Sequence, residues 1–385
     1  MKSPAETRNF WLLAALGAMV AAIGLGAAHY MEVHGHVVTG MNNQIVWGLP
    51  HVFAIFMIVA ASGVLNIASI GSVFGQSAYK PRAPLSGLLS IALLMGGLMV
   101  LMLDLGRPDR VIVAATHVNF TSVFAWNVVL YSGMVGIVAV YLFTMFERRY
   151  HHFSKYAGLA AFTWRFILTT GTGSIFAFLV ARQAYQSALL APMFIVLSFG
   201  WGLAVFLLVQ SSMFAWNQRH LSPEVERRMA RLLGVFIVAS LYLVAVYHIT
   251  NLYYARQSAF EAFILRDGGV FPLLFWVGYG MVGSLIPLAL LFHPRLSGEK
   301  STAIASVLVI GGALAWLFVF ILGGQAFPLD IFPGHTVSSS FGDGKVAHYS
   351  PSLPEFLLGL GGVGVAFLLT VIGIRVLNFM PQDDL

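Results

Sequence analysis

The chain has 385 residues, of which 58% are hydrophobic and only 9% are charged, and its formal net charge is +6. An ordinary soluble domain carries about 25% charged residues, so this composition excludes a protein whose whole surface faces water. The mean hydropathy of +0.83 indicates a chain that lies in a bilayer. The positive charge does not indicate a nucleic-acid partner, because the basic residues are spread over short loops and are better explained by orientation in a membrane.

Long apolar segments follow one another along the whole chain. A helix needs about 20 apolar residues to cross a bilayer. Ten segments of about this length are present: Phe10–Tyr30, His51–Phe74, Leu85–Leu103, Val123–Phe146, Ala157–Val180, Met193–Phe214, Leu232–Tyr253, Phe271–Phe292, Thr302–Leu322 and Phe356–Leu377. A membrane β-barrel would show short alternating segments instead. We therefore predict an all-α integral membrane protein with about ten transmembrane helices arranged in bundles.

The basic residues predict which side of the membrane each loop faces. Ten spans place both termini on one side, and 15 of the 21 Lys and Arg residues fall on that side. The positive-inside rule therefore predicts that both termini are cytoplasmic. The first segment is longer than a secretory h-region and has no small-residue cleavage site before Met31, so we expect it to be retained as a span.

A charged stretch, "LDLGRPDR", follows the third span on the predicted outer face. It holds Asp104, Arg107, Asp109 and Arg110. The three-residue spacing allows Asp104 and Arg107 to pair on one helical turn. Two interpretations remain open: a self-neutralised helix end at the depth of the lipid headgroups, or the rim of a functional site.

Further hydrogen-bonding side chains fall at the same predicted depth. They are His29, His51, Asn119, Ser122, Trp126 and His248. Polar groups within a membrane are costly unless paired, and they often line functional sites. A single His near the end of a span is more often an interfacial residue, so the prediction of a site depends on convergence of these groups in space.

A quinone head group would suit this set, because it needs a hydrogen-bond donor at each carbonyl and groups that exchange protons near neutral pH. Haem b is a weaker alternative, since it needs two His on facing helices at matched depth, and none of His29, His51 and His248 lies in the middle of a span. The sequence has no Cys, which excludes a thiolate-held iron–sulfur cluster or covalent haem within it.

A proton- or solute-translocating transporter is the alternative function. Transporter sites lie near the membrane midplane on broken helices, and "TTGTGS" at 169–174 is the one local hint of such a helix. The ionisable groups gather at the outer face instead. That distribution favours the quinone-binding function.

The predicted spans divide into a core and an extension. We expect an eight-span core over residues 1–300 and two additional spans over residues 301–385. The extension contains a long outer loop, 323–355, rich in Pro, Gly and Ser. This loop is too long for a simple connection, so it is either a lid packed on its own helices or a docking surface for another subunit.

The motifs "LDLGRPDR" and "NFTSVFAWN" resemble those of the NrfD/polysulfide-reductase family of membrane subunits, which are similar to PsrC. "GLPHVFAIFMIVAASGVLNIASIGSVFG" and "GQAFPLDIFPG" are most similar to the ten-span, DsrP-type branch from sulfur-metabolising bacteria. The resemblance covers most of the first eight spans.

This resemblance implies a subunit of a respiratory redox complex in a bacterial inner membrane. It would exchange electrons between menaquinone or ubiquinone and a periplasmic ferredoxin-like iron–sulfur subunit, with further catalytic or cytochrome subunits, and would hold no haem or cluster of its own. His29 matches the family's quinone-binding His at the outer end of the first span, and Asn119, Ser122 and Trp126 match its fourth-span positions. We expect catalytic roles for His29 and Asp104, with Arg107 keeping Asp104 ionised, and quinone contacts from His51 and His248.

Overall fold

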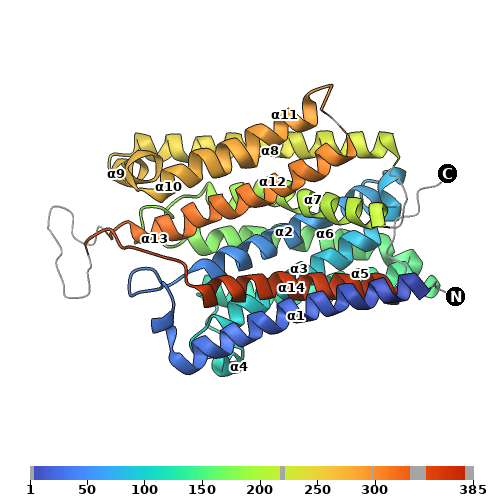
Figure 1. Ribbon diagram of the computed structural model, residues 1–385, viewed down its shortest axis with the longest axis horizontal. Coiled ribbons are helices and arrows are strands. Elements are labelled where there is room, and N and C mark those ends of the chain that lie inside the picture. The colour runs from blue at the N-terminus through green and yellow to red at the C-terminus, as the bar shows by residue number, and fades with distance from the viewer. Residues whose placement is uncertain (1–3, 217–221, 297, 330–343, 378–385) are drawn as a thin grey trace.

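The computed structural model describes residues 4–216, 222–296, 298–329 and 344–377 (Figure 1). Helices make up 82% of the described residues, which form no strand. The uninterrupted long helices are α1 (Pro4–His34), α2 (Leu49–Ser72), α3 (Ala83–Leu103), α5 (Val123–Phe146), α6 (Ser154–Ala177), α7 (Leu190–Trp216), α8 (Pro223–Tyr253) and α14 (Leu353–Val376).

Two further long helices contain wider, π-helical turns. In the first, α10 (Val270–Leu273) continues through Leu274–Leu285 into α11 (Ile286–Phe292). In the second, α12 (Glu299–Phe318) continues through Val319–Gly323 into α13 (Gly324–Ala326). Short helices complete the described part of the chain, namely α4 (Val111–Thr116) and α9 (Ser258–Ala262).

Nine of the helices in the described residues are long and apolar enough to cross a membrane. The predicted span Ala157–Val180 is also a helix, α6, but it is not among the nine. Arg165 and a run of Thr residues make α6 less apolar than the other spans. Helix α6 packs on α2, α5 and α7, and protein covers Arg165, Thr169 and Thr172, which are 2%, 1% and 0% exposed.

Helix α2 lies at the centre of the bundle. It is hydrophobic on every side, which is typical of a helix buried all round, and it packs on α3, α6, α7 and α14. Most of its residues after Pro50 are buried. The sequence neighbours α2 and α3 therefore run side by side, and the first turn of α2 lies beside the last turn of α3.

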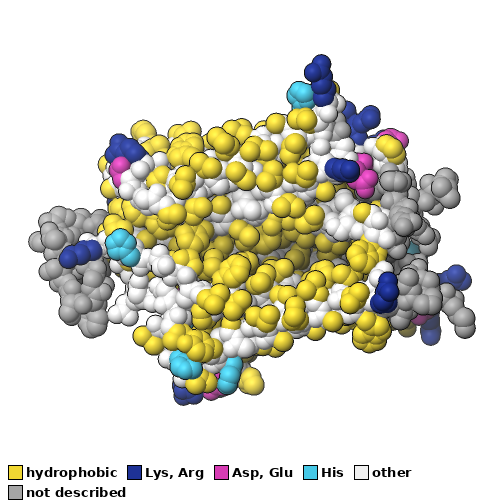
Figure 2. Space-filling view, viewed as in Figure 1, with side chains coloured by type: hydrophobic (Ala, Val, Ile, Leu, Met, Phe, Trp, Pro, Cys, Tyr) yellow, Lys and Arg dark blue, Asp and Glu magenta, His cyan; other side chains and the backbone are white. Residues whose placement is uncertain are grey.

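Both described ends of the chain lie at the same end of the bundle (Figure 1). The opposite end holds α4, α9 and the segment 35–48, and we call it the outer end, following the predicted orientation. Figure 2 shows hydrophobic side chains along the length of the bundle, with charged and His side chains gathered towards its two ends. This distribution is the one expected of a helical bundle surrounded by lipid.

The last helix packs against the first. Helix α14 runs along α1 and α3, and α12 packs on α7, so the two additional spans contact the core along their length. The division at residue 300 stays a prediction. Of the long outer loop, residues 330–343 lie outside the described residues, while 344–352 lies against segment 35–48, where Asn42 donates a hydrogen bond to the carbonyl of His348 (3.3 Å).

Candidate functional site

His51 and Asp104 meet at the outer end. Helix α2 begins at Leu49, aided by Pro50 in its first turn, so His51 lies in that first turn. Helix α3 ends at Leu103, and Asp104 is the next residue. The Nδ1 atom of His51 lies 2.9 Å from Oδ2 of Asp104, and the Asp104 side chain is 1% exposed.

The contact between His51 and Asp104 is an ion pair whenever His51 is protonated. The two groups are not aligned for a hydrogen bond, and neither carboxylate oxygen of Asp104 accepts one from the described residues. A buried carboxylate without hydrogen-bond donors is costly. Asp104 is therefore a group that would gain from binding a proton or a donor.

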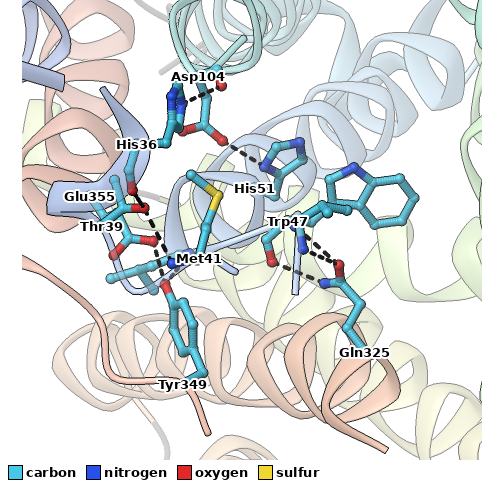
Figure 3. A network of polar contacts seen from close by, with 11 residues as sticks. His36, Thr39, Met41, Trp47, His51, Asp104, Gln325, Tyr349 and Glu355 are labelled. Atoms are coloured by element: carbon cyan, nitrogen blue, oxygen red, sulfur yellow. Dashed lines mark hydrogen bonds and ion pairs between the residues drawn. The ribbon is translucent and has the colours of Figure 1, made fainter. Parts of the chain in front are cut away.

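A second His approaches Asp104 from the other side. His36 lies in a 3₁₀ turn, His36–Val38, that follows α1, and its Nε2 atom is 3.1 Å from the backbone carbonyl of Asp104. Because a carbonyl can only accept, Nε2 of His36 carries the hydrogen and its Nδ1 is free to accept one. Figure 3 shows His36 and His51 on either side of Asp104.

A cleft opens between the end of α1 and the turn after α3. Its volume is about 110 Å³, whereas one water needs ~10–15 Å³ on the same measure. Its walls combine apolar side chains with three ionisable ones, and the lining residues are Leu25, Ala28, His29, Glu32, His36, Leu103, Leu105, Gly106 and Pro108. Neither His51 nor Asp104 lines the cleft, but Asp104 lies between the lining residues Leu103 and Leu105 in the sequence, and the lining residue His36 contacts its carbonyl, so the pair is next to the cleft.

Trp47 covers His51 on the side away from the cleft. The two rings are stacked with their centroids 5.9 Å apart. Gln325, 1% exposed, fixes Trp47 by accepting hydrogen bonds from the backbone N–H groups of Val46 and Trp47 and donating to the Trp47 carbonyl, all at 3.0 Å. The position of His51 is thus supported by a residue nearly 280 positions away in the sequence.

Tyr349 and Glu355 bind the same segment from the C-terminal part of the chain (Figure 3). The Tyr349 hydroxyl donates to Oε1 of Glu355 (2.7 Å) and accepts from the N–H of Leu49 (2.7 Å). Oε2 of Glu355 accepts from the N–H groups of Gly40 (2.9 Å) and Ser352 (2.8 Å). Burial, followed by the hydrogen bond to Glu355, raises the pKa of the Tyr349 hydroxyl, so the hydroxyl stays protonated and donates a hydrogen bond.

The expected pairing of Arg107 with Asp104 is wrong. Helix α3 ends before Asp104 and the chain turns at Gly106, so the two residues do not share a helical turn. Arg107 instead donates from Nε and a terminal nitrogen to both oxygens of Asp109, at 3.2 Å each. The hydrogen bond from Arg107 holds the pKa of Asp109 below its usual value. Both side chains are exposed.

Asn119, Ser122 and Trp126 lie in and after the turn that starts α5. Their side-chain contacts are local: Asn119 accepts from the hydroxyl of Thr121 (2.7 Å), and Trp126 donates to the carbonyl of Phe120 (2.8 Å). Asn119 and Trp126 are exposed, and Ser122 is half-buried. The structure does not bring these three to the His51–Asp104 pair. Another residue, Phe124, links α5 to the site by packing edge-on to Trp47, with centroids 6.3 Å apart.

His248 belongs to a separate cluster. Its Nδ1 atom lies 2.6 Å from Oε2 of Glu261 on α9, and Oε1 of Glu261 accepts a hydrogen bond from Asn251 (2.7 Å). Glu261 is 0% exposed. The ring of Phe275 packs on His248, with centroids 4.7 Å apart. His248 therefore has its own buried carboxylate partner rather than a place beside the cleft.

The sequence prediction named His29, which lines the cleft, and the contacting pair His51 and Asp104, but it did not name other residues around them. Glu32 and His36 were available from the same sequence argument, since both lie close to His29 in the outer segment. Nothing local in the sequence marks Gln325 or Glu355 as part of the site. In the described part of the chain, no three His, Asp or Glu side chains form a group that could hold a metal ion.

Comparison with known proteins gives the same family across most of the chain. The model of the family described as "Polysulphide reductase, NrfD" matches residues 37–329. The integral membrane subunit of an Hdr-like menaquinol oxidoreductase from Archaeoglobus fulgidus is 28% identical, covering 99% of this chain and 96% of the relative.

Two further relatives are named as parts of reductases. A putative dimethyl sulfoxide reductase membrane subunit from Halobacterium salinarum is 26% identical over 94% of this chain and 89% of its own length. A polysulfide reductase polypeptide from Wolinella succinogenes is 23% identical over 74% of this chain and 96% of its own length. With the family match extending over most of its residues, the chain belongs to the polysulphide reductase, NrfD family of multi-pass membrane proteins.

Proposed function

We propose that this protein is the quinone-interacting membrane subunit of a respiratory redox complex. It exchanges electrons between the quinone pool and an iron–sulfur partner subunit docked at the outer end, which faces the periplasm if the host is a bacterium with two membranes. Its relative from Archaeoglobus fulgidus, named for a menaquinol oxidoreductase, favours menaquinol. Its relative from Wolinella succinogenes, named for polysulfide reductase, supports a role in sulfur-compound metabolism.

The observation that carries this proposal is the cleft beside the His51–Asp104 pair. Apolar walls from Leu25, Leu103 and Pro108 suit a lipid-soluble ring, while His29, Glu32 and His36 offer polar atoms at one site. Ligand pockets typically combine an apolar lining with a few placed polar groups. The unsatisfied carboxylate of Asp104 next to the cleft supplies a place for a proton.

The residues around the cleft have distinct roles in this proposal. A bound quinol supplies two electrons and two protons. His29 and His36 orient the head group through ring nitrogens, and Glu32 accepts a proton at the cleft mouth. Asp104 takes a proton at its carboxylate and passes it to Nδ1 of His51, 2.9 Å away, so that a protonated imidazole lies beside the restored carboxylate. An imidazole beside a carboxylate is suited to such transfer near neutral pH.

Substitution of Asp104 and of His29 tests the proposal. We expect Asp104→Asn and His29→Ala each to lower quinol-linked electron transfer about a hundredfold or more, within the range typical of general acid–base groups, while the complex still assembles in the membrane. Asp109→Asn is the matched control, because Asp109 lies in the same turn but is exposed and bound to Arg107. Turnover unchanged in both site variants would remove this cleft as the quinol site.

A further inference from the structure

The last loop and helix of the chain complete the network around His51. Tyr349 and Glu355 lie beyond residues 37–329, the part matched by the family model. Yet their side chains contact the segment that leads into α2, which carries His51 (Figure 3). The part of the chain outside the family match therefore holds a part of the candidate site.

The contacts fix both ends of a short strap, residues 40–49. Glu355 binds the N–H of Gly40 at one end, and Tyr349 binds the N–H of Leu49 at the other. The strap is packed so closely that a Cβ at Gly48 would lie 2.3 Å from Oε1 of Glu355. His51 follows the strap by two residues, so a shift of the strap would move the imidazole relative to Asp104.

Burial and hydrogen bonds fix the side chain of Glu355. It is 0% exposed and accepts hydrogen bonds from Gly40, Ser352 and Tyr349. It also forms a capping box with Ser352 at the start of α14, where the helix dipole favours a negative charge. Three donors and the helix end stabilise a carboxylate that is buried without a basic partner among these contacts.

Tyr349 links Glu355 to the surroundings of Asp104. The hydroxyl of Tyr349 is hydrogen-bonded to Glu355. It also lies close enough to Asp104 for the two side chains to interact electrostatically. The titratable groups around Asp104 come from several elements: His51 on α2, His36 after α1, Glu32 and His29 on α1, and Tyr349 and Glu355 from the last segment. Arg182 reaches the neighbouring strap through the carbonyl of Gln44 (2.8 Å).

We propose that Tyr349 and Glu355 are positioning residues for the His51–Asp104 pair, so that the last two spans complete the quinol site. This inference rests on the proposed function. Tyr349 holds the start of α2 at Leu49, and Glu355 holds the strap at Gly40 and places a negative charge near Asp104. Neither side chain lines the cleft, so both act through the pair and not on the quinol.

Tyr349→Phe tests the positioning by geometry. The variant keeps the ring but leaves the N–H of Leu49 without its acceptor, so the first turn of α2 can shift. Because small misplacements of reacting groups cost on the order of tenfold or more in rate, we expect kcat with a soluble quinol analogue to fall about tenfold while KM changes little. Tyr253→Phe, at an exposed tyrosine near the outer end of α8, is the matched control and should leave both constants unchanged.

Glu355→Gln tests the electrostatic part of the proposal. Gln keeps an acceptor for the strap and removes the negative charge. A nearby negative charge disfavours a second one, so its removal favours the deprotonated form of the His51–Asp104 pair. We expect the acid limb of the kcat/KM pH profile to move to lower pH in the assembled complex, a change that a merely structural role for Glu355 would not produce.

Asp104→Asn separates the two proposals. If it inactivates the complex while Tyr349→Phe and Glu355→Gln retain the wild-type kcat and pH profile, the positioning role is overturned. If Asp104→Asn has no effect, the proposed function fails first, whatever the other two variants do. Should Tyr349→Phe prevent assembly, the pH profile of Glu355→Gln alone decides, and an unshifted acid limb would refute the inference.

Discussion

Individual buried acids distinguish the outer end of this bundle. Asp104, Glu261 and Glu355 are all nearly or fully buried there, and each has a different environment. Glu355 accepts three hydrogen bonds, Glu261 is paired with His248 and Asn251, and Asp104 contacts His51 without an aligned hydrogen bond. The first two environments satisfy the carboxylate, which is the pattern of a structural group. The environment of Asp104 leaves both of its carboxylate oxygens without a hydrogen bond from the described residues.

The His248–Glu261 pair is expected to stabilise the outer ends of α8 and α9. Glu261→Ala would leave His248 and Asn251 buried without their partner, and removing one member of a buried pair costs about 3–5 kcal/mol. Glu224→Ala removes the acid of an exposed pair with Arg228, whose side chains are 72% and 54% exposed, and should cost about 0–1 kcal/mol. Unfolding of the purified protein in detergent, followed by circular dichroism, measures the difference. Equal losses would contradict a structural role for the pair.

For single residues, the sequence predicted the depth of each side chain in the membrane but not the direction in which it points. His51 and Asp104 were both expected at the outer end, and the structure places them 2.9 Å apart, while their functional roles stay predictions. Asn119 and Trp126 share that depth but turn towards their own loop. Glu355 could not be found, because its partners Gly40 and Tyr349 are set by the packing of α14, and a sequence gives no such pairing across 315 residues.

Helices in this bundle approach each other closely where two glycines face each other. On α1 and α14, a Cβ added to Gly24 would lie 2.5 Å from the Cα of Gly361. Small residues allow such contacts between membrane helices, where dispersion and not water exclusion drives association. This contact brings α14 against α1 and so carries Glu355 to the strap.

A larger side chain at this contact should separate the two helices. Gly24→Leu would overpack the α1–α14 interface, and such changes cost roughly 1–3 kcal/mol. Gly26→Leu is the matched control on the same helix, because a Cβ there meets nothing within 4 Å. Thermal denaturation in detergent gives the comparison. A midpoint lowered as much by Gly26→Leu as by Gly24→Leu would show that the contact does not matter.

The long helices could be predicted from hydropathy, whereas the short helices and the π-helical turns could not. The predicted Val123–Phe146 span agrees with α5, and Leu85–Leu103 differs from α3 only at its start. Hydropathy did not reveal α4, α9 or the π-helical turns, since these depend on how chain ends pack rather than on apolar length. Helix α6 was predicted although its polar residues lower its hydropathy, and neighbouring helices bury three of these residues, Arg165, Thr169 and Thr172.

The whole molecule is asymmetric between its two ends. The end that holds the termini carries most of the basic residues, whereas the outer end carries the buried His–carboxylate pairs and the cleft. If the positive-inside rule sets the orientation, protons released from a quinol in the cleft would leave on the side away from the cytoplasm. If the protein oxidises quinol as proposed, its orientation therefore decides whether that reaction contributes to a proton gradient.

The orientation can be measured by cysteine labelling, because the natural sequence contains no Cys. Val37, 87% exposed at the outer end, and His152, exposed in the turn between α5 and α6 at the other end, are suitable positions. We expect Val37→Cys to react with a membrane-impermeant maleimide in intact cells whose outer surface is accessible. His152→Cys should react only after the membrane is opened, and the cysteine-free parent should not react at all. The opposite pattern would place the cleft on the cytoplasmic side, where quinol oxidation would release its protons into the cell and could not build a gradient.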